Sequence, residues 1–162
     1  MARVVLVGLP GAGKSTLARA LADRWGCAAL DTDDVLARRV ATPTAAYLRD
    51  AGEDRFRAAE LDALVEALGA DAVVATGAGV VTRADARARL RAERTLWLDA
   101  PDATLLERVG DGDRPLLGDR PAEALARLRD ERSPLYQEVA SATVDTSGSL
   151  EEALERLAEA AS

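Results

Sequence analysis

The feature of this sequence that most limits how it folds is a short apolar run that ends at a glycine-rich turn. Residues 4–7 read Val-Val-Leu-Val, residues 8–15 read Gly-Leu-Pro-Gly-Ala-Gly-Lys-Ser, and a helix-forming segment follows from Leu17. A strand, a tight loop and a helix in this order are typical of a sheet with helices packed on its faces. The loop also fits the pattern G-x-x-x-x-G-K-[ST], whose backbone N–H groups and helix N-terminus hold the phosphates of a nucleotide.

Each position in this pattern has a physical role. Glycine lacks a Cβ, so the backbone amides of the loop can approach an anion closely. Lys14 would reach the β- and γ-phosphates, the Ser15 hydroxyl would coordinate Mg²⁺, and the Thr16 amide would face the phosphates. Lys14 is the only lysine among the 21 basic residues, and a compact ammonium suits a phosphate contact. A chance turn that caps a helix is the alternative, but the strand before and the helix after disfavour it. The expected phosphate contacts are Gly11, Ala12, Gly13, Lys14, Ser15 and Thr16.

Composition excludes several other classes of protein. A chain of 162 residues with 48% hydrophobic content is the size of one domain, so we expect a single domain over residues 1–162. The formal charge of −7 argues against a nucleic-acid or anionic-membrane surface. One cysteine, Cys27, and no histidine exclude an internal disulfide framework, histidine-based zinc sites and Ser-His catalysis, which leaves general-base work to a carboxylate. The first apolar run is too short for a signal peptide or membrane span, which favours a cytoplasmic location.

Short apolar runs alternate with helical patterns along the chain, which indicates a parallel sheet with helices on both faces. The predicted strands are Val4–Gly8, Ala28–Asp31, Ala72–Gly77, Thr95–Asp99 and Thr143–Asp145. A long helix is expected from about Glu53 to Leu68, and another from a Thr82 cap through Leu90. Ser149 and Glu152 form a capping-box pair for the last helix, for which we predict a buried stripe of Leu150, Leu154, Leu157 and Ala161.

Ligands of parallel sheets collect at the carboxyl ends of the strands. The glycine-rich loop, Asp31–Asp34 and Gly77–Gly79 all follow predicted strands, so we expect these three segments to converge. At 31–34, Thr32 or Asp33 caps a helix, or the carboxylates hold Mg²⁺ through water and orient or deprotonate a substrate hydroxyl. The neighbouring phosphate loop favours the second interpretation. Local pattern does not select among the arginines, each of which alone is most simply a solvated side chain: Arg55, Arg57, Arg114, Arg127, Arg129 and Arg132.

Six segments in this order resemble the shikimate kinase family, small members of the nucleoside-monophosphate-kinase-like P-loop enzymes. They are residues 8–16, Leu-Asp-Thr-Asp at 30–33, Gly-Glu-Asp-Arg-Phe-Arg-Ala-Ala-Glu at 52–60, Gly-Ala-Gly at 77–79, Arg-Pro-Leu-Leu at 114–117 and Arg-Ser-Pro-Leu-Tyr at 132–136. The likeness runs through essentially the whole length. It implies an α/β, three-layer P-loop kinase fold with a central five-stranded parallel sheet flanked by helices. It also implies a small substrate-binding helical segment at about 33–61 and a mobile lid at about 110–120.

The resemblance further implies an activity, ATP-dependent phosphorylation of the 3-hydroxyl of shikimate, on the route to chorismate and the aromatic amino acids, by a monomer that uses Mg²⁺. Lys14, Asp33 and Arg114 would be the catalytic residues: Asp33 binds the substrate hydroxyls and is the candidate to take the proton, and Arg114 sits on the lid. Asp31 would support Mg²⁺ with Ser15, and Arg108 would pack against adenine. The substrate contacts that the resemblance implies are Asp33, Arg57, Gly77, Ala78, Gly79 and Arg132, with the two arginines clamping the carboxylate.

Two other functions stay open at this point. Ala78 stands where the family usually has the middle of three glycines, and residues 41–48 lack a glycine and some bulky apolar residues. These departures suggest a related kinase for another hydroxylated acid such as gluconate. A nucleotide-binding regulatory module without transfer activity is a third candidate, but it has no need of Asp33 or the lid arginine.

Overall fold

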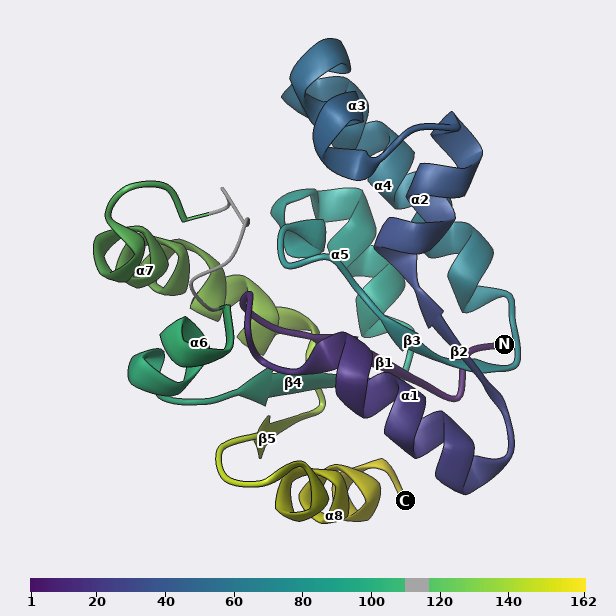
Figure 1. Cartoon of the computed structure of the whole chain (residues 1–162). Helices are drawn as coiled ribbons and strands as arrows, with labels where there is room; N and C mark the ends of the chain where they lie inside the picture. Colours follow the sequence, from purple (N-terminus) through teal and green to yellow (C-terminus); the bar gives the residue numbers. More distant parts are fainter. Residues whose placement is uncertain (110–116) are drawn as a thin grey trace.

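Five short segments form one parallel sheet with the strand order β2-β3-β1-β4-β5 (Figure 1). The computed structural model describes residues 1–109 and 117–162 of the chain. The strands are β1 (Val4–Val7), β2 (Ala28–Asp31), β3 (Ala72–Ala75), β4 (Thr95–Asp99) and β5 (Ala142–Asp145). All five predicted strands are confirmed to within two residues at either end, and the parallel sheet is confirmed with them.

Helices cover both faces of the sheet, as predicted. On one face α1 packs against β2, β3 and α8, while α4, α5 and α7 contact one another or the sheet on the other face (Figure 1). The described helices are α1 (Lys14–Trp25), α2 (Thr32–Val40), α3 (Thr44–Ala51), α4 (Glu53–Leu68), α5 (Ala84–Arg91), α6 (Asp102–Val109), α7 (Pro121–Val139) and α8 (Leu150–Ala161), with a short 3₁₀ helix η1 (Val80–Thr82). Among them, none has both the length and the apolar character that crossing a bilayer requires.

The main core lies on both sides of β1, whose four residues are fully buried. Leu21, Leu64 and Leu98 are fully buried in the same cluster. Each such side chain contributes about 1.5–3 kcal/mol by leaving water. Because β1 is held between β3 and β4, the loop that follows it starts from the buried central strand of the sheet.

A second, smaller apolar cluster lies outside this core. It consists of Val35, Leu36, Phe56 and Ala63, which join α2 to α4, and α3 packs on the same group through Tyr47 and Leu48. Figure 1 shows α3 farther from the sheet than any other helix of this group. The helical segment expected at about 33–61 is therefore built around apolar contacts of its own.

Two local predictions about helix ends were wrong. Thr82 does not cap α5: it ends η1, its hydroxyl donates to the Gly79 carbonyl at 2.8 Å, and α5 begins two residues later at Ala84. Leu150 is not part of a buried stripe but is 50% exposed. A side chain in the first turn of a helix points over the residues that precede it, and Leu150 lines a pocket together with Thr146. The capping box of Ser149 and Glu152 is confirmed.

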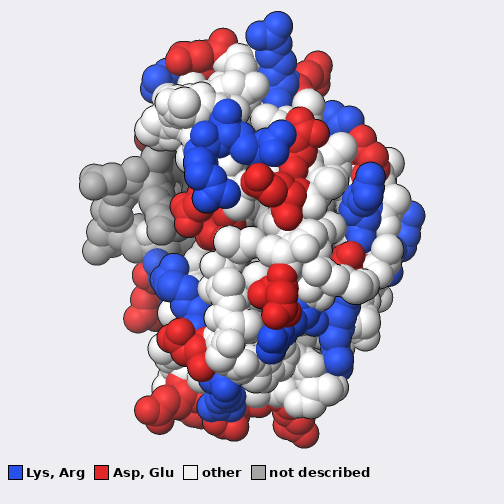
Figure 2. Space-filling view, turned by 90° about the vertical axis from the view of Figure 1, so that its right-hand side faces the viewer, with Lys and Arg blue, Asp and Glu red and all other residues white. Residues whose placement is uncertain are grey.

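Charged side chains of both signs are interspersed over the surface. On the face in Figure 2, blue Lys and Arg side chains lie among red Asp and Glu side chains. Many of these charges are paired between elements that are distant in sequence, such as Arg24 with Glu155 at 2.6 Å and Arg87 with Glu138 at 2.9 Å. Exposed pairs of this kind contribute little to stability.

Candidate active site

The glycine-rich loop joins β1 to α1 with two left-handed residues. Gly11 has φ 84° and Gly13 has φ 92°, a region that side chains disfavour, and α1 begins at the next residue, Lys14. The Lys14 ammonium donates to the carbonyls of Gly8 at 2.7 Å and Leu9 at 3.0 Å. Burial lowers the pKa of Lys14 to about 8, although Asp33 and Asp31 pull it the other way. The loop thus presents a helix N-terminus and a cation to one space.

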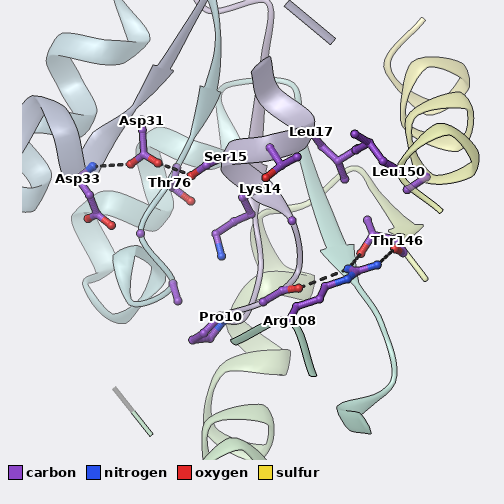
Figure 3. Close-up of a pocket in the computed structure, with 16 residues that line it drawn as sticks. Pro10, Lys14, Ser15, Leu17, Asp31, Asp33, Thr76, Arg108, Thr146 and Leu150 are labelled. Atoms are coloured by element: carbon purple, nitrogen blue, oxygen red, sulfur yellow. Dashed lines mark hydrogen bonds between the residues drawn. The ribbon is translucent and has the colours of Figure 1, made fainter. Parts of the chain in front are cut away.

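A pocket opens over this loop (Figure 3). Its lining comes from the loop itself, from the carboxyl end of β2, from the residues after β3 and from the far side of the loop, where α6, β5 and α8 meet. In Figure 3, Lys14 lies between Asp33 on one side and Arg108 with Thr146 on the other. The glycine-rich loop, the segment at 31–34 and the segment at 77–79 therefore converge on one pocket, as expected. The lining residues are Pro10, Gly11, Gly13, Lys14, Ser15, Thr16, Leu17, Asp31, Asp33, Thr76, Gly77, Ala78, Arg108, Thr146, Leu150 and Ala153.

Asp31 connects β2 to both neighbouring helices. One carboxylate oxygen accepts the Asp33 backbone N–H at 2.8 Å and caps α2, while the other accepts the Ser15 hydroxyl. The cap is therefore Asp31, and not Thr32 or Asp33, which the disfavoured alternative named. The Thr32 hydroxyl instead accepts the Gly77 N–H at 3.1 Å and so ties the start of α2 to the end of β3. The Ser15 hydroxyl and the Asp31 carboxylate thus lie together at the N-terminus of α1, and both are oxygen donors of the type that Mg²⁺ prefers.

Asp33 faces the same pocket from the first turn of α2. Its pKa is raised to about 6, first by burial and then by the charges of Asp31 and Glu60, with Lys14 acting in the opposite direction. A carboxylate whose pKa approaches neutrality is well suited to accept a proton at physiological pH.

The helical position of Arg57 alone suggested a solvated side chain. In the structure Arg57 instead lies largely buried on α4. Its guanidinium donates to Glu60 at 2.8 Å and to Glu53 at 3.1 Å, and the side chains of Arg57 and Glu60 are only 15% and 4% exposed. The guanidinium covers Gly79: a Cβ there would lie 2.5 Å from Arg57 Nη2. A Cβ on Gly77 would similarly lie 2.8 Å from Glu60 Oε2 and 3.0 Å from Asp33 Oδ1. Glycine at these positions lets charged side chains approach the backbone.

Glu60 was not predicted as a site residue, although a signal for it is present in the sequence. In the expected long helix Glu60 stands four residues from both Phe56 and Leu64 and so on the same apolar face, and a buried carboxylate requires a partner. Arg57, three residues earlier, is that partner. Burial raises the pKa of Glu60, and the charge of Arg57 partly offsets this.

Arg132 and Tyr136 approach the loop at 77–79 from α7. The Tyr136 hydroxyl donates to the Ala78 carbonyl at 2.6 Å. Arg132 Nε is buried and finds no hydrogen-bond partner among residues 1–109 and 117–162. The charge of Arg132 affects the pKa values of Lys14 and Glu60, so Arg132 belongs to the same charged neighbourhood. Gly77 and Ala78 line the pocket, whereas Gly79 does not. Arg57 and Arg132 do not line the pocket either but lie beside the loop at 77–79.

On the far side of the pocket, Arg108 joins α6 to the glycine-rich loop. It donates to the Gly11 carbonyl at 3.3 Å, to the Thr146 hydroxyl at 3.2 Å and to the Thr146 carbonyl, and the Thr146 hydroxyl donates to the Ala12 carbonyl at 2.8 Å. Thr146 was missed as a site residue, although it directly follows the last strand, where the strand-end rule points. Ala12 is buried and does not line the pocket. Arg114 and the predicted lid up to residue 116 lie outside the described residues.

Comparison with known proteins identifies the family. The family model for shikimate kinase matches residues 10–162. The chain belongs to the shikimate kinase family. The shikimate kinase of Thermobifida fusca (strain YX) is 43% identical over 145 residues, which cover 88% of this chain and 84% of that one. The resemblance found in the sequence is thereby confirmed.

Solved structures agree with this membership of the shikimate kinase family. The structure of a shikimate kinase from Acinetobacter baumannii in complex with shikimate is similar, with a TM-score of 0.89 and 34% identity over 96% of this chain and 90% of that chain. A gluconokinase from Sinorhizobium meliloti 1021 has a TM-score of 0.70 at 20% identity, over 98% of this chain and 90% of that chain. That second likeness shows a shared fold, and the P-loop kinase fold predicted for this family member is confirmed.

Proposed function

We propose that this kinase transfers the γ-phosphoryl group of ATP to the 3-hydroxyl of shikimate, giving shikimate 3-phosphate and ADP. The observation that carries the proposal is the convergence, in a member of the shikimate kinase family, of a phosphate loop, the Asp33 carboxylate and the buried Arg57 at one edge of the sheet. A cation cluster beside a carboxylate suits a substrate that carries both a carboxylate and hydroxyl groups.

At the nucleotide end, residues 11–16 would hold the phosphates through the backbone amides at the start of α1, and Lys14 would pair with the β- and γ-phosphates. The apolar side chains of Leu17 and Leu150 line the opposite part of the pocket, where the base would lie against Arg108. Arg114 would complete the site from the lid. A lid that closes over ATP keeps water from taking the phosphoryl group.

Mg²⁺ would be held by Ser15 and Asp31, whose side chains are already in contact. Mg²⁺ usually takes one or two protein oxygens and completes its shell with phosphate oxygens and water. This donor set fits, since a hydroxyl and a carboxylate supply the oxygen ligands that Mg²⁺ prefers. The ion would neutralise charge that develops on the transferred phosphoryl group.

At the substrate end, Asp33 would accept a hydrogen bond from the reacting hydroxyl and take its proton as the phosphoryl group transfers. Arg57 and Arg132 would bind the carboxylate, together with the backbone of Gly77, Ala78 and Gly79. Orientation is the main contribution expected from these residues, because phosphoryl transfer depends on positioning and electrostatic stabilisation more than on covalent participation of the protein.

A coupled assay of ADP release tests the proposal. We expect turnover to depend on shikimate, with gluconate giving a rate no higher than the slow hydrolysis of ATP alone. Formation of shikimate 3-phosphate should match ADP release one to one. Equal rates with and without shikimate would contradict the proposal, and a preference for gluconate would favour the related kinase instead.

We further infer one domain over residues 1–162, a monomer and a cytoplasmic location. The continuous main core that joins both helical layers to the sheet supports the single domain. Size-exclusion chromatography with light scattering tests the monomer, and a single unfolding transition tests the single domain.

A further inference from the structure

Tyr136 is a buried side chain that the proposed mechanism leaves without a role. It is fully buried on α7, its ring packs against Trp97 with 5.7 Å between the ring centroids, and its hydroxyl donates to the Ala78 carbonyl at 2.6 Å. The residues it joins are 58 positions apart. A packed ring needs no hydroxyl, so the polar end of this side chain calls for an explanation beyond the filling of the core.

The hydrogen bond acts on a peptide group that the substrate would meet. The Ala78 carbonyl and the Gly79 N–H belong to the same peptide group, which is trans like every peptide bond described in the chain. In a trans peptide the C=O and N–H bonds point in opposite directions. By holding the Ala78 oxygen, Tyr136 therefore fixes the direction of the Gly79 N–H, which is opposite to that of the Ala78 C=O bond.

The Gly79 N–H is a buried donor without a partner within the described residues, next to Ala78, which lines the pocket. Gly77 donates its own N–H to Thr32, and the carbonyls of Gly77 and Gly79 accept from Val80 and Thr82. Within the described part of the chain, the N–H groups of Ala78 and Gly79 have no hydrogen-bond partner. The Arg57 guanidinium lies directly against Gly79. A backbone donor next to a guanidinium is a combination that favours a carboxylate.

We propose that Tyr136 is a positioning residue, which orients the Ala78–Gly79 peptide so that the Gly79 N–H and Arg57 bind the substrate carboxylate together. This inference rests on the proposed function, because it assigns the carboxylate to that place. The same helix carries Arg132 one turn earlier, so α7 supplies a guanidinium and also fixes the loop that this guanidinium approaches. Movement of α7 thus changes both at once.

The chemistry of the phenol suits this role. Burial raises the pKa of Tyr136 well above that of a free tyrosine, so the hydroxyl stays protonated and remains a donor. Replacement by phenylalanine keeps the ring in contact with Trp97 and removes only the donor. The Ala78–Gly79 peptide is then free to rotate, and the Gly79 N–H loses its fixed direction.

The test compares Tyr136→Phe with a control that removes a buried hydroxyl elsewhere. Thr95 is such a control: it is fully buried at the start of β4, away from the strand ends that form the site, and its hydroxyl donates to the Leu90 carbonyl at 2.7 Å. In Tyr136→Phe we expect the KM for shikimate to rise about three- to tenfold, the effect of one hydrogen bond. The KM for ATP should stay within about twofold, and Thr95→Val should change neither constant.

A second measurement does not depend on activity. In the ligand-free protein, the ¹⁵N relaxation of the Gly79 amide should show new exchange broadening in Tyr136→Phe and none in Thr95→Val. An unchanged Gly79 amide, or a KM for ATP that rises as much as the KM for shikimate, would overturn the role of Tyr136. A wild-type protein without shikimate-dependent turnover would instead refute the proposed function, while the Gly79 signal would still decide whether Tyr136 orients the peptide.

Discussion

Replacing Asp33 with asparagine should stabilise the ligand-free protein and remove its turnover at the same time. Asp33 has a pKa of about 6 instead of 3.8, because it is partly buried and lies near the charges of Asp31 and Glu60, which Lys14 only partly offsets. The folded state therefore holds the Asp33 proton more tightly than the unfolded state. The free energy of unfolding must then fall as the pH rises from about 3.8 to about 6, and level off above that.

The size of the effect follows from the two pKa values. The difference between about 6 and 3.8 is a cost of about 3 kcal/mol when Asp33 is ionised in both states, near pH 8. Near pH 4.5 the same linkage gives a cost of only about 1 kcal/mol, because the folded state is still protonated. An asparagine never carries the charge. The gain in stability of Asp33→Asn over the wild type should therefore grow by about 2 kcal/mol between the two pH values.

Urea unfolding at both pH values, followed by circular dichroism, measures this gain, provided that the slope m is the same for both proteins. Asp34→Asn is a matched control, since it removes the same charge from an exposed neighbour in the same helical turn. An acidic residue in the first turn favours the helix, so this control should lose up to about 1 kcal/mol. A gain for Asp33→Asn that is absent at pH 8, or equal at both pH values, would refute the reasoning.

Further predictions concern the charges and the glycine around the pocket. Lys14→Ala should lower kcat by about 10²- to 10³-fold in the ADP-release assay, through loss of a preorganised cation at the phosphates. Arg57→Ala should cost about 2–5 kcal/mol of shikimate binding, measured by calorimetry, while Arg55→Ala, an exposed neighbour, should cost none. Gly79→Ala should weaken shikimate binding, because the added Cβ displaces the Arg57 guanidinium. Its melting temperature should change little, because the Gly79 φ of −93° suits alanine. In the Arg57→Ala background, Gly79→Ala should cause no further loss of shikimate binding. The kcat/KM for shikimate should rise with pH through about 6, as Asp33 loses its proton, and a profile flat between pH 5 and 7 would contradict that assignment.

The strands and the phosphate loop were predictable because their signals are local. A run such as Val4–Val7 is apolar at every position, and the spacing from Gly8 to Ser15 defines the loop without any knowledge of its neighbours. The capping box at Ser149 is equally local. These three features depend on residues that are close together in the sequence, so the sequence alone was sufficient for them.

The local pattern was insufficient where distant contacts decide the outcome. Asp31, Thr32 and Asp33 can each cap a helix. Which of them does so depends on where β2 stops pairing with β3, at Asp31 opposite Ala75. Thr32 is then directed toward the loop after β3, a contact over 45 positions. Arg57 could be distinguished from the other arginines only through the family resemblance, because its burial depends on the approach of Gly79.

The charges of the site explain how a protein with a net charge of −7 can bind two anions. Three cations, Lys14, Arg57 and Arg132, lie in one charged neighbourhood with the carboxylates of Asp31, Asp33 and Glu60. Glu60 holds the Arg57 guanidinium in a buried position before any substrate is present, so less ordering is required on binding.

Among residues 1–109 and 117–162, no cation lies within ion-pair distance of Asp33. Asp31 and Glu60 repel the Asp33 carboxylate, and only the more distant Lys14 offsets this repulsion. Loss of the Asp33 charge should therefore stabilise the ligand-free protein. Loss of Glu60 should destabilise it, because Arg57 would be left buried without its closest ion-pair partner. Two carboxylates in one site thus have opposite effects on stability. Asp33, the one that destabilises the fold, is also the one that lines the pocket, as expected if catalysis requires a group that the fold alone would not retain.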